Sequence, residues 1–484
     1  MTAREAVTLL TGPAGFTEHL QPPRDLPADG PLGWAGYDAA RERARTRTGE
    51  EESVVYGTGA VGDRACVLLS FEFGFLGGSL GRRTGDRLEA AYELALTRRL
   101  PLLALVATGG SRMQEGMVAL TQLQRVAAAA TRLRAAGLPQ IAVVRDPTTG
   151  GGWATVGAGA DVVLALPGAQ VGFAGSRVRP ADANPHAYSA EGQFAAGQVD
   201  AVVPAGELTA TVTHWLRALG PHVVTSAQPS GTGPHDPSGA PGADAPRADA
   251  PDADTHTTPP APGLPAAPVP RALPVPSAAA RLPETGREAV ARARDARRPR
   301  AQAYLADYFA VRLPLHGDRC GGTDPGLLCG FGLRADGSPV AYVAQCGTAT
   351  RPAGYRTAAR TIRLADRLGV PVLTLVDTPG AANDAEAERA GAGAAIAETF
   401  AAIAAARVPV TTLVIGEGGS GGALALAAPG NTHVTADSYF SVIAPELAAA
   451  ILKRPPSETG ATADQLRLRP QDLVDLGFAR SIAG

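Results

Sequence analysis

Two ten-residue stretches of the chain decide its fold. Residues 101–110 read Pro-Leu-Leu-Ala-Leu-Val-Ala-Thr-Gly-Gly, and residues 371–380 read Pro-Val-Leu-Thr-Leu-Val-Asp-Thr-Pro-Gly. Each begins with proline, continues as a short apolar run and ends in a threonine followed by glycine. This pattern is typical of a buried strand that leads into a tight turn.

A second strand and a glycine-rich turn follow each stretch at the same distance. The proline that opens the second strand follows the proline that opens the first by 38 positions in both cases. A helical stretch fills the gap, at about 114–136 in the first case and in an alanine-rich segment in the second. Strands separated by one helix predict right-handed βαβ units with parallel pairing. The second strands and their glycine runs are residues 141–144 with 148–152, and residues 409–414 with 416–422.

A constant offset of 270 positions superimposes the two patterns. It maps Thr108 on Thr378 without a gap, and it also aligns three glycine pairs. Several matches at one offset indicate an internal duplication. We therefore expect an α/β protein of two similar units, residues 1–220 and 281–484. The matched glycines are Gly110 with Gly380, Gly151 with Gly421, and Gly152 with Gly422.

Residues 221–280 differ from both units. They contain 15 of the 41 prolines and no Ile, Phe, Tyr or Trp. Such a segment cannot bury enough apolar surface to offset its ordering entropy, so the composition predicts a disordered or partly polyproline linker.

Composition excludes several classes of function. The formal net charge is −2, which offers no basic surface for nucleic acid or anionic lipid. Lys453 is the only lysine, and no Gly-Lys-Ser/Thr phosphate loop exists. The four cysteines form no C-x-x-C pair, so no zinc site is expected. With no signal peptide and no apolar run of about 18 residues, the chain is expected to be cytoplasmic.

The glycine turns are the candidate site. Where a strand gives way to a helix, the first backbone amides of the helix have no partner in it and favour negative charge. Such amides can form an oxyanion hole without side chains. A single Gly-Gly turn is more often simple tight packing, but two symmetric sets favour function. No G-x-G-x-x-G follows a strand, no G-x-S-x-G is present, and the eight histidines are scattered.

Long motifs in both units resemble the carboxyltransferase of acetyl-CoA carboxylase. In the first unit they resemble its β subunit, and in the second unit its α subunit. The chain is therefore similar to a β–α fusion, and the resemblance implies two crotonase-like domains. The β-like motifs are residues 71–81, 108–116 and 146–151, and the α-like motifs are residues 315–319, 351–356, 377–381 and 416–426.

The resemblance implies a reaction that needs no side-chain base. Carboxybiotin on a carrier protein would deliver the carboxyl group to an acyl-CoA such as acetyl-CoA, giving malonyl-CoA, and biotin itself would take the proton. By resemblance, one glycine set serves the thioester and the other the biotin ureido oxygen. These sets are Gly109, Gly110 and Gly151, and Gly418, Gly419, Gly421 and Gly422. Three arginines are candidate anchors for CoA phosphates or a carboxylate, a structural ion pair being an equal alternative for each: Arg112, Arg177 and Arg351.

The chain departs from the family pattern at four places, and one of them is a shortened stretch between Cys346 and Arg351. It lacks the zinc ribbon usual in the β subunit, Gly152-Trp153 replaces Val-Ser, and residues 382–384 replace a Tyr-Pro-Gly run. Lys453 does not lie between methionines, as a biotin-bearing lysine does, so biotin carboxylase and the carrier are expected to be separate chains. The family implies at least a homodimer. A malonyl-type decarboxylase and an inactive acyl-CoA-binding paralogue remain alternative readings.

Overall fold

The computed structural model describes residues 1–21, 24–180, 182–219, 264–274 and 281–484, which form two α/β units. The sheet of the first unit has eight strands in the order β1-β2-β3-β4-β5-β6-β8, with β7 added beside β5. Its pairs are parallel from β3 onward, whereas β1, β2 and β3 pair antiparallel. The strands are β1 (Phe16–Glu18), β2 (Val54–Val61), β3 (Arg64–Phe71), β4 (Leu102–Thr108), β5 (Gln140–Thr149), β6 (Val162–Ala165), β7 (Val171–Gly172) and β8 (Ala201–Val202).

The second unit repeats this sheet strand for strand. Its order is β9-β10-β11-β12-β13-β14-β16, and β15 pairs with β13 as β7 pairs with β5. The expectation of two similar α/β units is thereby confirmed. The strands are β9 (Val311–Leu315), β10 (Leu327–Leu333), β11 (Pro339–Gln345), β12 (Val372–Thr378), β13 (Val410–Gly419), β14 (Thr432–Thr435), β15 (Tyr439–Ser441) and β16 (Ser481–Ala483).

Helices pack on both sheets. Those of the first unit are α1 (Ala3–Thr11), α2 (Tyr37–Thr48), η1 (Leu76–Gly78), α3 (Arg82–Arg98), η2 (Met113–Glu115), α4 (Gly116–Leu120), α5 (Gln122–Ala135), α6 (Gly150–Gly152), η3 (Trp153–Gly157), η4 (Pro185–Tyr188), α7 (Ala190–Ala195) and α8 (Ala205–Leu219). Those of the second unit are α9 (Gly286–Ala293), α10 (Ala301–Tyr308), α11 (Pro352–Leu368), α12 (Ala385–Arg389), α13 (Ala392–Ala405), α14 (Ser420–Leu424), α15 (Pro445–Ile451), η5 (Pro456–Glu458), α16 (Thr459–Gln465) and α17 (Pro470–Asp475).

The offset of 270 positions holds in three dimensions. Helices α11 and α13 begin and end 270 positions after α3 and α5. Leu102 pairs with Gln140 between β4 and β5, and Val372 pairs with Val410 between β12 and β13. The register of both strand pairs also shifts at the equivalent point, between Val106 and Thr108 in β4 and between Val376 and Thr378 in β12. The predicted helix at 114–136 is real, but it is divided into η2, α4 and α5.

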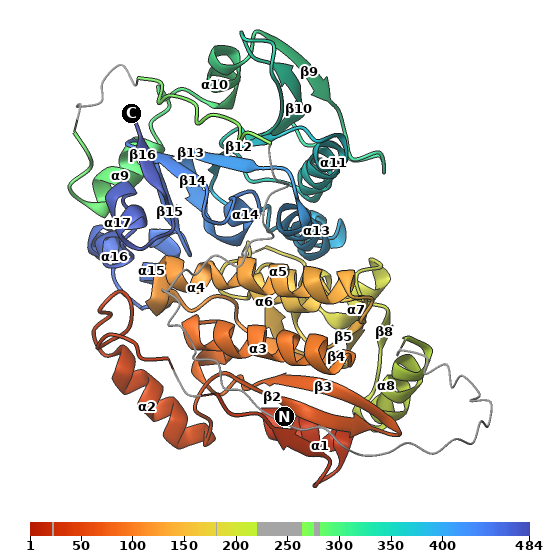
Figure 1. Ribbon diagram of the computed structural model, residues 1–484. Helices are drawn as coiled ribbons and strands as arrows, with labels where there is room; N and C mark the ends of the chain where they lie inside the picture. Colours follow the sequence, from red (N-terminus) through yellow and green to blue (C-terminus); the bar gives the residue numbers. More distant parts are fainter. Residues whose placement is uncertain (22–23, 181, 220–263, 275–280) are drawn as a thin grey trace, which may run out of the picture.

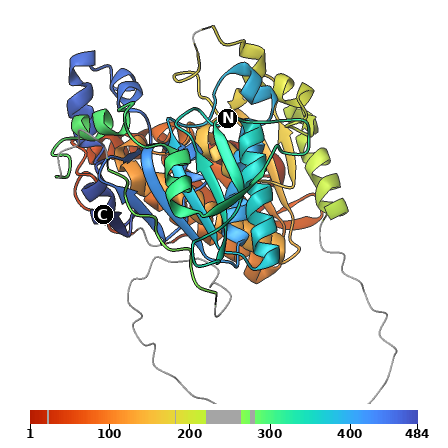
Figure 2. The same ribbon diagram turned by 90° about the horizontal axis from the view of Figure 1, so that it is seen from above.

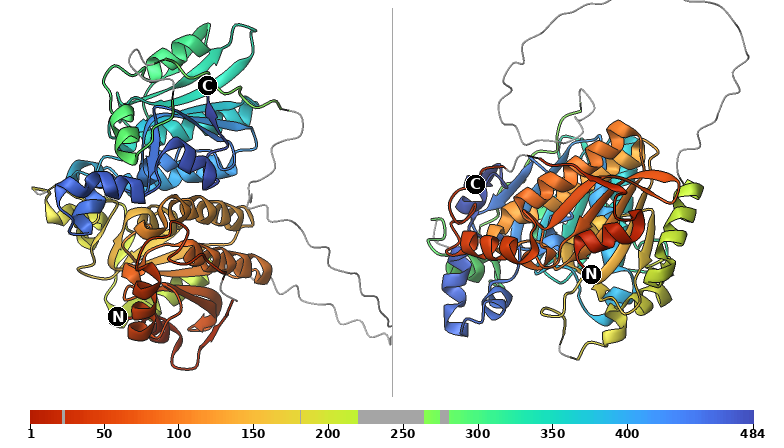
Figure 3. Two further views of the ribbon diagram at one scale, coloured as in Figure 1. Left: turned by 90° about the vertical axis from the view of Figure 1, so that its left-hand side faces the viewer. Right: turned by 90° about the horizontal axis from the view of Figure 1, so that it is seen from below.

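The two units are stacked, with α5 of the first lying beside α13 of the second (Figure 1). The view from above places the second unit over the first (Figure 2), and the side view shows the same two layers (Figure 3). Val126 of α5 and Phe400 of α13 belong to one core cluster that continues from unit to unit. The glycine turns of both units lie next to this contact, as described below.

Residues 264–274 of the predicted linker are described, and they contact the second unit without helix or strand of their own. Ala267 is buried, and its carbonyl accepts a hydrogen bond from Thr411 Oγ1 of β13 at 2.8 Å. The carbonyl of Pro268 accepts another from Tyr308 Oη at 2.9 Å. A proline-rich chain can dock in extended form by such carbonyl contacts without secondary structure of its own. The rest of the predicted linker, 221–263 and 275–280, lies outside the described residues. No described helix is long and apolar enough to cross a membrane.

Candidate active site

The first glycine turn is formed where the ends of β4 and β5 meet. Gly110 has a φ of +99°, which favours glycine, and a Cβ there would lie 3.4 Å from the Cα of Gly150. The amide of Gly109 donates to the carbonyl of Gly77 at 2.9 Å, and the amide of Gly110 donates to Thr108 Oγ1 at 3.0 Å. Both amides are thus used within the chain. The described residues give the amide of Gly151 no hydrogen-bond partner, so it is an available donor of this turn.

The second glycine turn repeats this geometry. Gly380 has a φ of +140°, and its amide donates to Thr378 Oγ1 at 3.1 Å, as Gly110 does to Thr108. Gly418 and Gly419 lie inside β13 and pair with β15, so their backbone belongs to the sheet. Gly421 and Gly422 lie in the first turn of α14, which begins at Ser420, and their amides have no partner in the described part of the chain.

The two turns converge on one side chain of α5. A Cβ built on Gly151 would lie 2.5 Å from Cδ1 of Leu123, and a Cβ built on Gly421 would lie 3.5 Å from the same atom. Phe173, which follows β7, is 3.8 Å from that Cβ of Gly421. The glycines that the 270-residue offset pairs are therefore brought together in space by the stacking of the two units.

A pocket of about 200 Å³ continues along the same contact between the units. It lies between α5 and α13 and reaches η3, where Thr155 Oγ1 donates to the carbonyl of Gly151 at 2.7 Å. Alanines make up most of its wall, and Arg134, Arg363 and Glu398 supply charge. The pocket thus begins about one helical turn from the first glycine turn.

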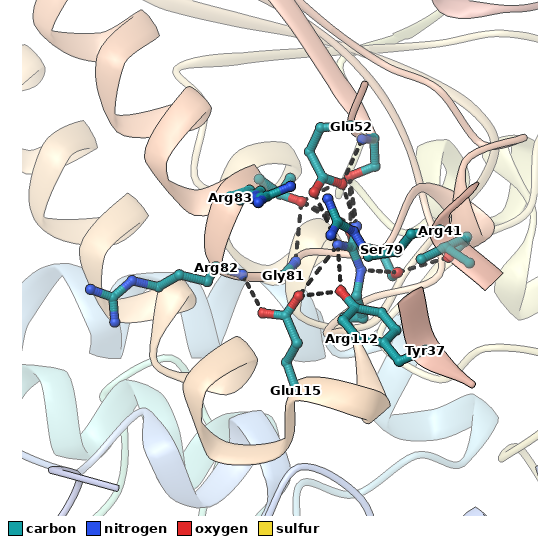
Figure 4. A network of polar contacts seen from close by, with 12 residues as sticks. Tyr37, Arg41, Glu52, Ser79, Gly81, Arg82, Arg83, Arg112 and Glu115 are labelled. Atoms are coloured by element: carbon teal, nitrogen blue, oxygen red, sulfur yellow. Dashed lines mark hydrogen bonds and ion pairs between the residues drawn. The ribbon is translucent and has the colours of Figure 1, made fainter. Parts of the chain in front are cut away.

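Arg112 is buried, with 1% of its surface exposed, and its guanidinium is fully engaged (Figure 4). It donates to Glu52 Oε1 at 2.6 Å and to the carbonyl of Ser79 at 2.7 Å, and it lies 3.4 Å from Glu115. Burial alone would raise the pKa of Glu52, but Arg112 lowers it to about 2. This placement corresponds to the structural ion pair, the alternative left open by the sequence, and leaves no donor for a ligand.

The other two arginines lie on loops. Arg177 is exposed and forms no ion pair within the described residues. Arg351 opens α11 and contacts Asp384 at 3.2 Å and Glu386 at 3.3 Å, with 38% of its side chain exposed. Both are accessible, in contrast to Arg112.

Comparison with known proteins identifies the two units. A model of the carboxyl transferase domain matches residues 31–211, and one described as acetyl co-enzyme A carboxylase carboxyltransferase-like matches residues 280–483. The acetyl-coenzyme A carboxylase carboxyl transferase subunits beta/alpha of Saccharopolyspora erythraea are 36% identical over 466 residues, 92% of this chain and 74% of the relative. The chain belongs to this carboxyltransferase family. It is a carboxyl-transferring enzyme.

Further relatives agree with this assignment. The beta/alpha subunits of Parafrankia sp. are 39% identical over 503 residues, covering 100% of this chain and 78% of the relative. A probable biotin-dependent acyl-coenzyme A carboxylase beta3 subunit of Mycobacterium bovis is 31% identical, covering 91% and 81%. Among solved structures, a transcarboxylase 12S chain aligns at 20% identity with a TM-score of 0.38, covering 100% of this chain and 86% of that one.

The carboxyltransferase also contains two buried carboxylates that sequence reasoning did not select. Asp377 is held by Arg298 at 2.9 Å and by Arg300 at 3.0 Å. Glu388 of α12 contacts the first unit. The sequence gives Asp377 one signal, its place three residues before Gly380, but none for Glu388, whose partners lie more than 200 positions away. No group of three or more His, Cys, Asp or Glu that could hold a metal occurs among the described residues.

Proposed function

We propose that the enzyme transfers the carboxyl group of carboxybiotin, carried by a separate protein, to acetyl-CoA to form malonyl-CoA. The observation that carries this proposal is the approach of Gly151 and Gly421 to one atom of Leu123. Two glycine turns, one from each unit and each with a free backbone amide, therefore lie against the same side chain. A reaction between two substrates, each developing negative charge on an oxygen, needs two such donor sets.

Each set of backbone amides stabilises the oxygen of one substrate. The turn of Gly109, Gly110 and Gly151 serves the thioester oxygen, with Gly151 as the free donor and the other two setting the shape of the turn. The run from Gly418 to Gly422 serves the ureido oxygen, with Gly421 and Gly422 as the free donors. Amides held rigidly by a sheet and a turn lose little entropy when charge develops beside them, so they lower the barrier effectively.

The second turn fits a ureido oxygen. Gly421 has no positive φ, and a Cβ on it would find only ordinary contacts at 3.5–3.9 Å. The absent side chain therefore leaves open the approach to its amide rather than relieving a clash. When bound, carboxybiotin supplies both the carboxyl group and the base that removes the α-proton of the thioester. The chain itself binds, orients and excludes water.

The accessible arginines complete the substrate site. Arg177 and Arg351 are anchors for CoA phosphates or for the carboxylate, because guanidinium groups bind these anions through paired hydrogen bonds. Gly175, two residues before Arg177, lies near the first turn, since a Cβ on it would be 3.2 Å from Thr149 Oγ1. Arg112 is not included, because its donors are occupied.

The partners follow from the lone lysine and from the family. Biotin carboxylase and the biotin carrier act as separate chains, since Lys453 has no biotin-attachment context. The enzyme works in the cytoplasm as a dimer or larger homo-oligomer, without nucleic acid or membrane and without zinc.

Carboxyl exchange tests the proposal. The purified chain is incubated with malonyl-CoA and biocytin, then with the propionyl-derived and longer homologues, and formation of the decarboxylated acyl-CoA is followed. Exchange that depends on biocytin and is fastest with malonyl-CoA is expected. Release of CO₂ without biocytin would instead indicate a decarboxylase. CoA binding without turnover, even with a carrier protein present, would indicate an inactive paralogue.

A further inference from the structure

Glu388 reaches from the second unit to the backbone that supports the first glycine turn. Its side chain is buried, with 1% exposed. Its two carboxylate oxygens accept the amides of Phe173 at 3.0 Å and Ala174 at 2.8 Å. A buried carboxylate without these bonds would be strongly destabilising, so the contact fixes the segment after β7.

That segment in turn holds the glycine turn. The carbonyl of Phe173 accepts the amide of Gly150 at 3.1 Å, directly before the free amide of Gly151. The ring of Phe173 also lies beside Gly421 of the second turn. Phe173 is thus held at its N–H by one unit, binds the first turn through its carbonyl and touches the second turn with its ring.

Neighbouring contacts keep Glu388 in place. Asn383, just before α12, donates through Nδ2 to the carbonyl of Val178 at 2.9 Å, and its own carbonyl accepts from Tyr188 Oη at 2.7 Å. The segment of the second unit from Asn383 to Glu388 therefore binds the first unit at several points between Phe173 and Tyr188.

We infer that Glu388 is a positioning residue, which sets the first glycine turn from the opposite unit and so aligns the two amide sets. The inference rests on the proposed function of these turns. It assigns no direct contact with substrate to Glu388. Its removal should leave both turns in place within their own units but free to shift relative to each other.

Protonation gives this role a measurable signature. Burial raises the pKa of Glu388 to about 7, although the two amides and Arg179 oppose the rise. The other charged or titratable groups that act on it are Tyr188 of η4 and, on its own segment, Asp384; Arg389, the next residue, acts on Tyr188. Below pH 7 one carboxylate oxygen becomes a hydroxyl and ceases to accept an amide well, so turnover should fall. The pKa of Glu388 is higher in the folded enzyme than the ordinary value of 4.5, so burial favours its protonated form. Its contribution to stability is therefore full below pH 4.5 and is lost as pH rises to about 7. Activity should rise over the same range, so the two pH profiles run in opposite directions.

Exchange kinetics of Glu388→Gln provide the first test. The variant keeps the size of the side chain but places an amide –NH₂ group against a backbone donor. We expect kcat to fall by about 10- to 100-fold with little change in KM, as for a misaligned catalytic group. The acid limb near pH 7 should disappear, whereas Glu388→Asp should retain an acid limb at reduced kcat. Glu191→Gln is the matched control, since Glu191 accepts the amide of Gly168 at 2.7 Å on an exposed surface and should behave as wild type.

Hydrogen exchange provides a readout that does not depend on turnover. In Glu388→Gln the amides of Phe173, Ala174 and Gly150 should exchange faster, while the core strands stay protected. A variant with wild-type kcat and pH profile, or one whose amides stay protected while activity is lost, would overturn the inference. Absence of carboxyl exchange in the wild-type enzyme would refute the proposed function alone, because the hydrogen-exchange result would still decide whether Glu388 holds the turn.

Discussion

At the scale of single residues, Gly419 and Gly421 differ in the reason why each is glycine. A Cβ on Gly419 would lie 2.0 Å from the carbonyl oxygen of Pro379, so the backbone must move to accept it. A Cβ on Gly421 finds ordinary contacts but narrows the approach to a free amide. The first glycine is required by packing, and the second by the proposed chemistry.

Alanine substitution at these two positions should therefore separate stability from activity. Gly419→Ala should lower the free energy of unfolding by about 1–3 kcal/mol through overpacking. Gly421→Ala should fold normally but lose about 10²–10³-fold in exchange rate, comparable to the loss of one oxyanion-hole donor. Denaturant titration and biocytin exchange measure the two effects. Full exchange activity in well-folded Gly421→Ala would remove this turn from the mechanism.

Arg112 should matter for stability far more than for substrate affinity. Its removal leaves Glu52 and Glu115 buried without compensation, at a cost of about 3–5 kcal/mol. Arg112→Met should thus unfold at much lower denaturant concentration than wild type, yet KM for malonyl-CoA should be unchanged wherever the variant is folded. A stable variant with a raised KM would restore Arg112 as an anchor.

Acid should weaken the same network. The pKa of Glu52 is about 2 in the folded enzyme, below the ordinary value of 4.5 for a glutamate. Ionisation of Glu52 therefore stabilises the fold above pH 4.5, and this contribution is lost as pH falls toward 2. Wild type should therefore lose stability over this window, and Glu52→Gln should lose less. The free energy of unfolding is measured by denaturant titration at several pH values. If it depends on pH equally in the two proteins, the ion pair is contradicted.

At the scale of elements, α13 and η3 interlock across the units. Trp153 has 1% of its surface exposed, and a Cβ on Gly393 would lie 2.1 Å from its Nε1. Trp153 therefore occupies space that only a glycine on α13 leaves free. This explains one departure from the family pattern: the residue after the first glycine run has become a large ring that packs against the second unit.

A double-mutant cycle tests this interlock. Gly393→Ala should cost about 1–3 kcal/mol, and adding Trp153→Phe should recover part of the loss because the smaller ring relieves the clash. Gly206→Ala is the control: a Cβ there meets nothing within 4 Å, and alanine in helix α8 should be neutral or stabilising. Additive effects of the two interface substitutions on the denaturation midpoint would show that the residues do not touch in solution.

The elements themselves were largely predictable from the sequence. The prolines and apolar runs placed β4, β5, β12 and β13, and the shared spacing predicted their parallel pairing. The strands β5 and β13 extend to Thr149 and Gly419, further than expected. Sheet pairing with β7 and β15 overrides the low strand propensity of Asp146 and Pro147 in β5 and of the glycines in β13. The antiparallel start of each sheet also carries a turn signal, Gly62-Asp63 between β2 and β3 and Asp336-Gly337 between β10 and β11, which the expectations above left unused.

At the scale of the whole molecule, the duplication explains what the sequence could and could not predict. A constant offset identifies equivalent residues, such as Gly151 and Gly421, but says nothing of how one copy packs on the other. The contacts that join the units, including Glu388 with Phe173, connect segments more than 200 positions apart with no shared motif. These contacts depend on which side chains each unit leaves exposed once it has folded. A sequence pattern does not predict that set of side chains, whereas the structure shows it.

The lone lysine yields the last prediction for the molecule as a whole. Lys453 is exposed after α15 and has a positive φ of 57°, in a turn rather than in the methionine-flanked hairpin of a biotin acceptor. Co-expression with a biotin ligase should therefore leave the chain unlabelled on an avidin blot, while a carrier protein in the same cells is labelled. Lys453→Arg should retain full carboxyl exchange, because arginine preserves the charge at an exposed site. A biotinylated chain, or loss of exchange in Lys453→Arg, would show that the carrier function or a catalytic amine resides in this polypeptide after all.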